Sequence, residues 1–315
     1  MNAARKPDIL AIGEPLVEFN QAGGPGSRHY LQGFGGDTSN FAIAAARQGA
    51  KAAYFTRLGD DVYGQMLRDL WAGEGVDASA VESDPHAFTG IYFVTHSESG
   101  HQFSFFRTGS AASCMHPAQL PLGMVRSARL LHVSGVSFAI STSAADTCYA
   151  AIEAAHAAGV MVSFDTNLRL RLWSKDRARG VMSDVIGLSD ICLPSYDDVV
   201  VITGVTDPDA LVDFCLSRGA RIVALKLGAD GAIVADRKQR IRIAPHPCKP
   251  VDATGAGDTF GGAFVARVLA GDDLATAGKY ATVAAALSTE GFGAVEPIPT
   301  AEAVRRAISM KEAAP

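Results

Sequence analysis

The chain has 315 residues, of which 48% are apolar and 19% charged, and its net charge is −5 at pH 7. This composition is typical of a soluble globular protein with a large core, and the acidic balance excludes the broad basic surface that nucleic-acid binding needs. No apolar run reaches membrane-spanning length and the first seven residues do not resemble a secretory signal, so we expect a cytoplasmic protein that makes no membrane contact. The scattered cysteines form no CxxC pair and are expected to be reduced core thiols: Cys114, Cys148, Cys192, Cys215 and Cys248.

The N-terminal segment predicts the start of an α/β sheet. Residues 8–13 are a short apolar run that ends at glycine, which indicates a buried strand. Residues 14–19 alternate acidic and apolar side chains, which indicates a half-exposed strand leaving the sheet. Glu14 would then lie at the carboxyl end of the first strand, where α/β folds place ligand contacts.

A glycine-rich turn at residues 33–40 precedes an alanine-rich helix at 41–48, which Gly49 closes. Asp37 and Asn40 are predicted to face a ligand from the first turn of that helix. Ordinary capping also favours glycine and aspartate at such places, so a structural interpretation stays open.

The rest of the chain predicts a doubly wound sheet that is interrupted once. Residues 52–58 predict a strand and 62–73 an amphipathic helix, whereas the β-rich runs 89–96 and 101–108 flank a short polar loop and predict a hairpin. The regular alternation then resumes, with strands at 130–134, 160–164, 191–193 and 222–226 and a helix at 144–158. Without a repeat or a linker, residues 1–315 are expected to form one folding unit.

The segment 251–262 predicts an anion-binding loop that runs into a helix. Gly255, Ala256 and Gly257 are small enough for backbone N–H groups to approach an anion, and the apolar spacing from Thr259 onward is helical. A helix N-terminus suits a transferring phosphoryl group because its amides are free and its partial charge is positive. Capping also places acids there, but a carboxylate beside a phosphate is better explained if Asp258 accepts a proton from an attacking hydroxyl.

Two other phosphate-binding motifs are excluded. A Walker loop needs Gly-Lys followed by Ser or Thr, and here Gly278-Lys279 is followed by Tyr280. A dinucleotide fingerprint would need a third glycine at position 260, where Phe260 stands. We therefore interpret the loop as part of a phosphotransferase with Asp258 as general base.

Residues 252–258, which read Asp-x-Thr-Gly-Ala-Gly-Asp, and the turn at 33–40 resemble the two signatures of the ribokinase-like carbohydrate kinases, often called the PfkB family. The resemblance spans nearly the whole chain. It implies a three-layer α/β/α fold with a mostly parallel doubly wound sheet and a small β-sheet lid formed by about 14–34 and 88–110. It also implies ATP and Mg²⁺ as the nucleotide and metal and an anion hole formed by the amides of residues 255–257. The apolar face of the lid, which includes Tyr92, Phe103 and Phe105, is too large to leave exposed, so we expect partner lids to cover one another in a homo-oligomer.

The resemblance further assigns the nucleotide and metal residues. The nucleotide is expected along the turn Lys226, Leu227, Gly228, Ala229, Asp230 and Gly231, with Asn167, Gly255 and Gly257. A plain β-turn is compatible with the same residues. Asp198 stands where most relatives have glutamate and is expected to reach Mg²⁺ through water, while Asp252 and Thr254 match a site that often holds a monovalent cation such as K⁺.

Several segments resemble those of family members that phosphorylate 2-keto-3-deoxygluconate, a sugar acid. A physical argument agrees, because Arg107 and Arg169 could together grip one carboxylate. The expected substrate contacts are Glu14, Gly35, Gly36, Asp37, Asn40, Tyr92, Phe105, Arg107, Arg169 and Asp258. A fructokinase or another neutral-sugar kinase is the alternative, and a non-catalytic sugar-binding regulator is an alternative of another class.

Overall fold

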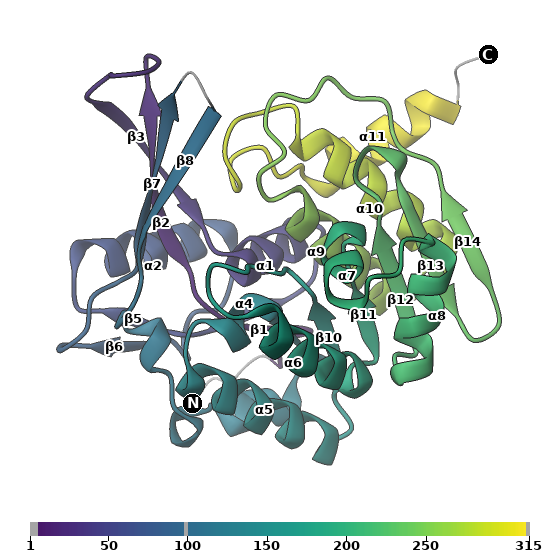
Figure 1. The fold of residues 1–315 in the computed structure, drawn as a ribbon, viewed down its shortest axis with the longest axis horizontal. Helices are drawn as coiled ribbons and strands as arrows, with labels where there is room; N and C mark the ends of the chain where they lie inside the picture. The colour runs from purple at the N-terminus through teal and green to yellow at the C-terminus, as the bar shows by residue number, and fades with distance from the viewer. Residues whose placement is uncertain (1–5, 98–99, 313–315) are drawn as a thin grey trace.

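The computed structural model describes residues 6–97 and 100–312 and contains one large and two small β-sheets (Figure 1). The large sheet has the order β14-β13-β12-β11-β10-β9-β1-β4, and all neighbours are parallel except the pairs β12–β13 and β13–β14. Its strands are β1 (Ile9–Ile12), β4 (Ala52–Phe55), β9 (Leu130–Ser134), β10 (Met161–Asp165), β11 (Ile191–Leu193), β12 (Ile222–Lys226), β13 (Ala232–Asp236) and β14 (Arg240–Ile243).

Helices cover both faces of this sheet because alternate strand residues point to opposite sides. Ile9 and Ala11 of β1 belong to one buried apolar cluster, and Leu10 and Ile12 belong to the other. The first cluster is shared with α1 (Asp37–Arg47), α2 (Val62–Glu74), α9 (Ala256–Ala270), α10 (Leu274–Ser288) and α11 (Ala301–Glu312). The second is shared with α3 (Leu122–Ser127), α4 (Gly135–Ala139), α5 (Thr142–Ala157), α6 (Lys175–Leu188), α7 (Tyr196–Thr203) and α8 (Pro208–Arg218).

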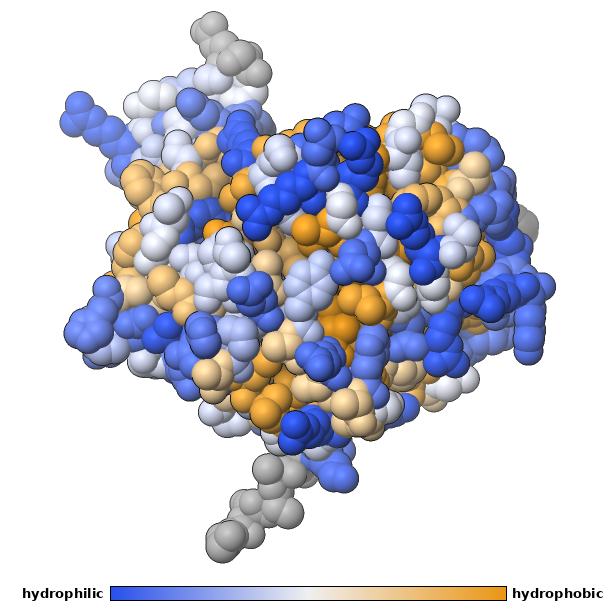
Figure 2. All heavy atoms as spheres, turned by 60° about the horizontal axis from the view of Figure 1, so that its bottom comes forward, coloured by the Kyte–Doolittle hydropathy of each residue, from blue (hydrophilic) through white to orange (hydrophobic). Residues whose placement is uncertain are grey.

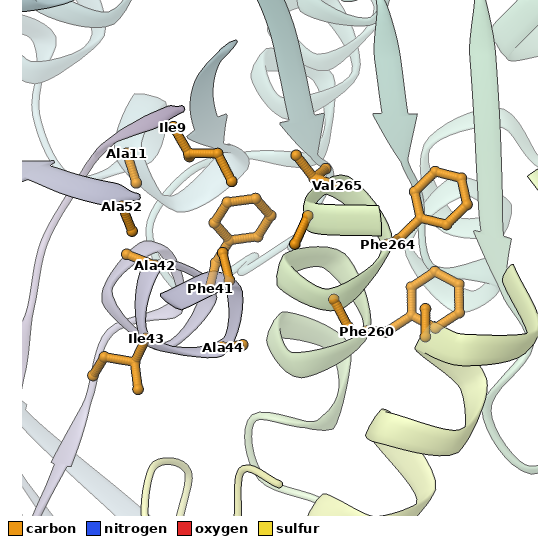
Figure 3. Close-up of a cluster of buried hydrophobic side chains, with 14 of the residues drawn as sticks. Ile9, Ala11, Phe41, Ala42, Ile43, Ala44, Ala52, Phe260, Phe264 and Val265 are labelled. Atoms are coloured by element: carbon orange, nitrogen blue, oxygen red, sulfur yellow. The ribbon is translucent and has the colours of Figure 1, made fainter. Parts of the chain in front are cut away.

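Two helices of the first layer, α1 and α9, approach each other closely. A Cβ atom at Gly262 of α9 would lie 2.5 Å from the carbonyl oxygen of Phe41, so only glycine fits at this crossing. The buried Phe41 ring lies between β1 and α9, near Ile9 and Val265 (Figure 3). This contact brings the first turns of two helices that are more than 200 residues apart in sequence to one place.

The second sheet stands beside the large one as a lid (Figure 1). Its order is β3-β2-β7-β8, in which β2 and β7 are parallel and the outer pairs antiparallel. The strands are β2 (Leu16–Ala22), β3 (His29–Gly35), β7 (Ile91–Ser97) and β8 (Gly100–Phe106). The predicted hairpin and outgoing strand are therefore confirmed, while residues 98–99 of the hairpin loop lie outside the described residues.

Three local predictions need correction. Residues 33–35 continue strand β3, so the glycine turn is shorter than expected and α1 begins at Asp37 rather than at residue 41. The predicted strand 52–58 is two strands, because β4 pairs with β1 whereas β5 (Arg57–Gly59) pairs with β6 (Glu82–Asp84) in a separate sheet. Helix α9 begins at Ala256, three residues before the predicted start.

The cysteines also differ in part from prediction. Cys148, Cys192 and Cys215 are buried thiols, but Cys114 is exposed at the end of a 3₁₀ turn, and Cys248 is half-buried. Within the described ranges no cluster of His, Cys, Asp and Glu side chains is suited to hold a metal, and none of the described helices is long and apolar enough to cross a bilayer. Figure 2 shows one face of the molecule, on which hydrophilic residues separate small apolar patches.

Candidate active site

The candidate site lies at the carboxyl ends of the parallel strands, on both sides of the point where the strand order reverses. Strand β1 pairs with β4 on one side and with β9 on the other, so successive connections leave in opposite directions there. Glu14 follows β1, Asp165 ends β10 and Lys226 ends β12. Ligand sites of open α/β sheets form at this position.

Asp258 lies in the first turn of α9, directly after the glycine cradle. Gly255 caps the helix with φ of 75°, and a Cβ atom there would lie 2.8 Å from the carbonyl oxygen of Ala294, so a side chain is excluded. The carboxyl Oδ2 of Asp258 accepts a hydrogen bond of 2.9 Å from the Nδ2 atom of buried Asn40, at the start of α1. The close packing of α1 and α9 thus orients the predicted base.

The surroundings of Asp258 disfavour its charged form. The side chain keeps some contact with water in the cleft, but protein atoms remove most of its hydration, and this burial raises the pKa to about 8. The carboxylates of Asp37 and Asp165 act in the same direction, whereas the hydrogen bond from Asn40 and the charge of Lys226 oppose the rise. A carboxyl group with a pKa near neutral is suited to proton exchange with a hydroxyl.

The predicted sugar-binding residues gather beside Asp258. Gly36 has φ of 102°, and a Cβ atom there would lie 2.4 Å from the carbonyl oxygen of Glu14, so the turn into α1 requires glycine. Asp37 follows, and its two oxygens accept hydrogen bonds from the backbone N–H of Thr38 (2.8 Å) and from Nδ2 of Asn167 (2.9 Å). Burial raises the pKa of the Asp37 carboxyl, and the positive charge of Arg169 partly offsets this effect.

The lid joins the sheet through a buried ion pair between Arg107 and Glu14. Glu14 is 1% exposed and also accepts a hydrogen bond of 3.1 Å from the Ser110 hydroxyl. Burial raises the pKa of Glu14, although Arg107 lowers it in part. Arg107 was predicted to meet a ligand carboxylate, but its Nη2 atom already donates to this protein carboxylate, and its buried Nε lacks a hydrogen-bond partner among the described residues.

The inner face of the lid carries the other predicted contacts. The pairing registers place Tyr92 opposite both Glu18 and Phe105, and the tyrosine hydroxyl donates to the Glu18 carboxylate. Burial raises the pKa of Tyr92, with smaller contributions in the same direction from Glu18, Asp252 and Asp258. A Cβ atom on Gly35, another predicted substrate contact, would lie 2.7 Å from the Tyr92 hydroxyl oxygen, so this face is turned toward the glycine turn before α1. Phe105 stacks on Tyr92 with ring centroids 5.3 Å apart, and the Arg107 guanidinium lies 5.5 Å from the Phe105 ring centre.

A cavity of about 780 Å³ lies on the other side of the cradle, at the end of β12. Its lining includes predicted nucleotide residues and the cradle: Lys226, Leu227, Gly228, Ala229, Gly231, Ala256 and Gly257. The opposite walls are the proline-rich segment at 245–250 and the α10 residues Ala285 and Ala286, which sequence reasoning missed. The only sequence signal for the segment 245–250 was its prolines, which predict an extended backbone but not a contact with a ligand.

Lys226 brings a positive charge to the cradle. Its Nζ lies 3.5 Å from the position of a Cβ atom on Gly257, and it forms a largely buried ion pair of 2.5 Å with Asp165. Asp165 was not among the predicted site residues. Asn167, which was predicted on the nucleotide side, has its amide against Asp37 instead.

Two further carboxylates were predicted to serve metals. Asp198, at the start of α7, accepts hydrogen bonds at Oδ2 from the Thr166 hydroxyl (3.0 Å) and the Leu168 N–H (3.1 Å), and burial raises its pKa. Asp252 accepts three hydrogen bonds, from the N–H and hydroxyl of Thr254 and from the N–H of Gly293. Oδ1 of Asp198 therefore accepts no hydrogen bond from the described residues, whereas the hydrogen bonds of Asp252 connect its loop to Thr254 and Gly293.

Comparison with known proteins agrees with this geometry. Residues 9–301 match the model of a family described as pfkB family carbohydrate kinase. The 2-dehydro-3-deoxygluconokinase of Thermoproteus tenax is 33% identical over 306 residues, which cover 93% of this chain and 91% of that protein. Fructokinase-2 of Solanum lycopersicum is 31% identical over 316 residues and 93% of each chain.

A solved structure supports the fold assignment. A putative ribokinase II from E. coli, in complex with ATP and Mg²⁺, superposes with a TM-score of 0.89 at 26% identity and covers 96% of this chain and 99% of its own. The large mostly parallel sheet, its two helical layers and the separate small sheet are thus the ribokinase-like architecture. The chain belongs to the pfkB family of carbohydrate kinases.

Proposed function

We propose that this protein transfers the γ-phosphoryl group of ATP to a hydroxyl group of a sugar acid, 2-keto-3-deoxygluconate, to give 2-keto-3-deoxy-6-phosphogluconate. The observation that carries the proposal is Asp258, which Asn40 orients in the first turn of α9, immediately after the glycine cradle. This carboxyl lies between the cavity of about 780 Å³ and the polar side chains around Asp37, which supports a nucleotide on one side and a sugar on the other. A base, an anion-binding loop and an acceptor site thus meet at one point.

The reaction needs few groups. The acceptor hydroxyl gives its proton to Asp258 while its oxygen forms a bond to the γ-phosphorus, and the bond from that phosphorus to the β-phosphate oxygen breaks. The N–H groups of Gly255, Ala256 and Gly257 and the dipole of α9 balance negative charge on the transferring group. Asn40 adds a buried Oδ1 without a partner among the described residues, which suits a sugar hydroxyl as donor.

ATP is proposed to lie in the cavity along Lys226 to Gly231, with its phosphates toward the cradle; this region includes Asp230, although that residue is not part of the cavity lining. The E. coli structure was solved with ATP and Mg²⁺. Mg²⁺, when bound with the nucleotide, would draw charge from the phosphate oxygens. Oδ1 of Asp198 accepts no hydrogen bond from the described residues, which supports a contact with the hydrated ion through water.

The choice of a sugar acid rests on the two arginines. The buried Nε of Arg107 lacks a partner among the described residues, and Arg169 follows by two positions Asn167, whose amide donates to Asp37. Both arginines therefore border the proposed acceptor site, where a carboxylate of the substrate would accept hydrogen bonds from them. The similarity to the Thermoproteus tenax 2-dehydro-3-deoxygluconokinase supports this choice, and the nearly equal similarity to fructokinases makes fructose the second candidate.

The test is a substrate panel. Purified protein with Mg-ATP is offered 2-keto-3-deoxygluconate, its galactonate-derived stereoisomer and fructose, and kcat/KM is measured for each. We expect the highest value for one of the two sugar acids. Preference for fructose would contradict the sugar-acid assignment, and no ATP turnover with any sugar or sugar acid would favour the non-catalytic alternative.

A monovalent cation beside Asp252 and Thr254 remains a prediction. Asp252 already accepts three hydrogen bonds, so a bound K⁺ would share these oxygens with the N–H and hydroxyl groups that donate to them. Activity measured in KCl and in tetramethylammonium chloride at equal ionic strength would reveal whether such an ion contributes.

A further inference from the structure

Asn167 has an unusual backbone conformation next to the candidate base. Its φ is 29°, and among the described residues every other positive φ belongs to a glycine. Left-handed backbone is unfavourable for most residues with a side chain, although asparagine tolerates it better than others. Such a conformation at a ligand site persists only when neighbouring groups hold it, so its contacts indicate what it is used for.

The conformation lets one residue bond to both sides of the cleft. The backbone N–H of Asn167 donates to Oδ1 of Asp165 (3.2 Å), and its side-chain Nδ2 donates to Oδ2 of Asp37 (2.9 Å). The other oxygen of Asp165 holds Lys226, beside the phosphate cradle. Asn167 is 8% exposed, so both hydrogen bonds are shielded from water.

We propose that Asn167 is a positioning residue that fixes Asp37 for the acceptor with its amide and fixes the Asp165–Lys226 pair for the ATP phosphates with its backbone N–H. This inference rests on the proposed kinase function. The amide and the N–H of Thr38 together hold both oxygens of Asp37, which leaves one orientation for the remaining lone pairs. The second contact fixes Asp165, and Asp165 in turn limits where the Lys226 amine can lie.

Glycine, aspartate and alanine each fail to supply both contacts. Glycine allows the left-handed backbone but has no amide, and aspartate would repel Asp37 because both side chains would be acceptors. Alanine lacks the amide and also resists the positive φ. Asn167→Gly therefore removes the amide contact alone, and Asn167→Ala removes both contacts.

A matched control lies at the other end of strand β10. Gly159 precedes that strand with φ of 71°, and a Cβ atom there would meet nothing within 4 Å. Gly159→Ala therefore introduces the same kind of backbone strain without touching the cleft. Initial rates are measured for wild type and the three variants with the best acceptor of the substrate panel, varying acceptor and ATP in turn, and thermal melting checks that each variant is folded.

Asn167→Gly should raise KM for the acceptor about 10-fold and change KM for ATP less than about 2-fold. Asn167→Ala should raise both values, because its backbone turns the N–H away from Asp165. Gly159→Ala should lower the melting temperature and leave both KM values unchanged.

Three results would overturn the inference while the kinase function stands. These are an acceptor KM within about 2-fold of wild type in Asn167→Gly, an ATP KM in Asn167→Ala equal to that in Asn167→Gly, and an acceptor KM raised as strongly by Gly159→Ala as by Asn167→Ala. Wild-type protein without activity on any acceptor would instead overturn the kinase function, and this inference with it.

Discussion

At the scale of single residues, the Asp258 carboxyl group is subject to opposing effects. Burial and two neighbouring carboxylates favour its neutral form, and Asn40 and Lys226 favour its charged form. We predict that Asp258→Asn lowers kcat by a factor of about 10² to 10⁴ and changes both KM values little, because the amide keeps the shape but accepts no proton. Steady-state kinetics measure this. Near-native kcat in the variant would exclude Asp258 as the base.

The same carboxyl group makes stability depend on pH. Its pKa is about 8 in the folded chain and 3.8 in a model peptide, so its contribution to stability is complete below about pH 4 and is lost as the pH rises toward 8. Asp258→Asn removes this dependence. Without nucleotide, the free energy of unfolding of the variant should equal that of wild type at pH 4 and exceed it by about 1–2 kcal/mol at pH 8.5. This difference is smaller than the full pKa shift of Asp258 implies, because water in the cleft screens the charge. Denaturant unfolding at both pH values tests this, and a constant difference would contradict it.

At the scale of elements, the ion pair between Glu14 and Arg107 connects the lid to the large sheet. Arg107→Ala would leave buried Glu14 without its cation, which costs about 3 kcal/mol, so a weaker substrate affinity in that variant alone is ambiguous. The double variant Glu14→Gln with Arg107→Ala removes the unpaired charge. We predict that it recovers most of the lost stability, while KM for the sugar acid stays raised about 10- to 150-fold and KM for ATP is unchanged.

Thermal melting and kinetics of the two variants, with fructose as the neutral comparison wherever it is used, separate the two roles of Arg107. If the double variant recovers the wild-type KM for the sugar acid together with stability, Arg107 supports the lid and does not bind the carboxylate of the substrate. The preference for a sugar acid over fructose would then depend on Arg169 alone.

The elements also show what a sequence can predict. Glu14, Asp258 and the glycines of both turns were found because strand ends, helix starts and close backbone approaches have local signals. Arg107 and Asn40 were predicted as substrate contacts, but their pairing with Glu14 and Asp258 within the protein was not predicted. Arg107 meets Glu14 across 93 positions and Asn40 meets Asp258 across 218, and such pairs depend on how lid and helices pack rather than on local spacing. Strand β3 was missed for the same reason, because its pairing with β2 defines it.

At the scale of the whole molecule, the lid exposes aromatic residues on both faces. Tyr92, Phe103 and Phe105 share one face as predicted, but it is the inner face, where Tyr92 is buried, and not a face left for a partner lid. On the outer face, Phe93 packs edge-on against both Tyr30 and Phe106, with ring centroids 5.5 and 6.0 Å away. An apolar surface for a partner lid is therefore expected on the outer face.

Phe106 is 56% exposed on that outer face and Tyr30 is 37% exposed, so water meets much of this aromatic strip in a single chain. Covering it with the same surface of a second copy would form a two-fold contact and remove this apolar area from water.

We predict that the wild-type protein sediments as a dimer or larger assembly at micromolar concentration and that Phe106→Ser shifts it toward monomer. Gln102→Ser, four residues away on the same strand and the same face, should leave the sedimentation coefficient unchanged. A wild-type monomer at that concentration would contradict a lid-mediated assembly, and equal dissociation of both variants would show that the aromatic strip is not the contact.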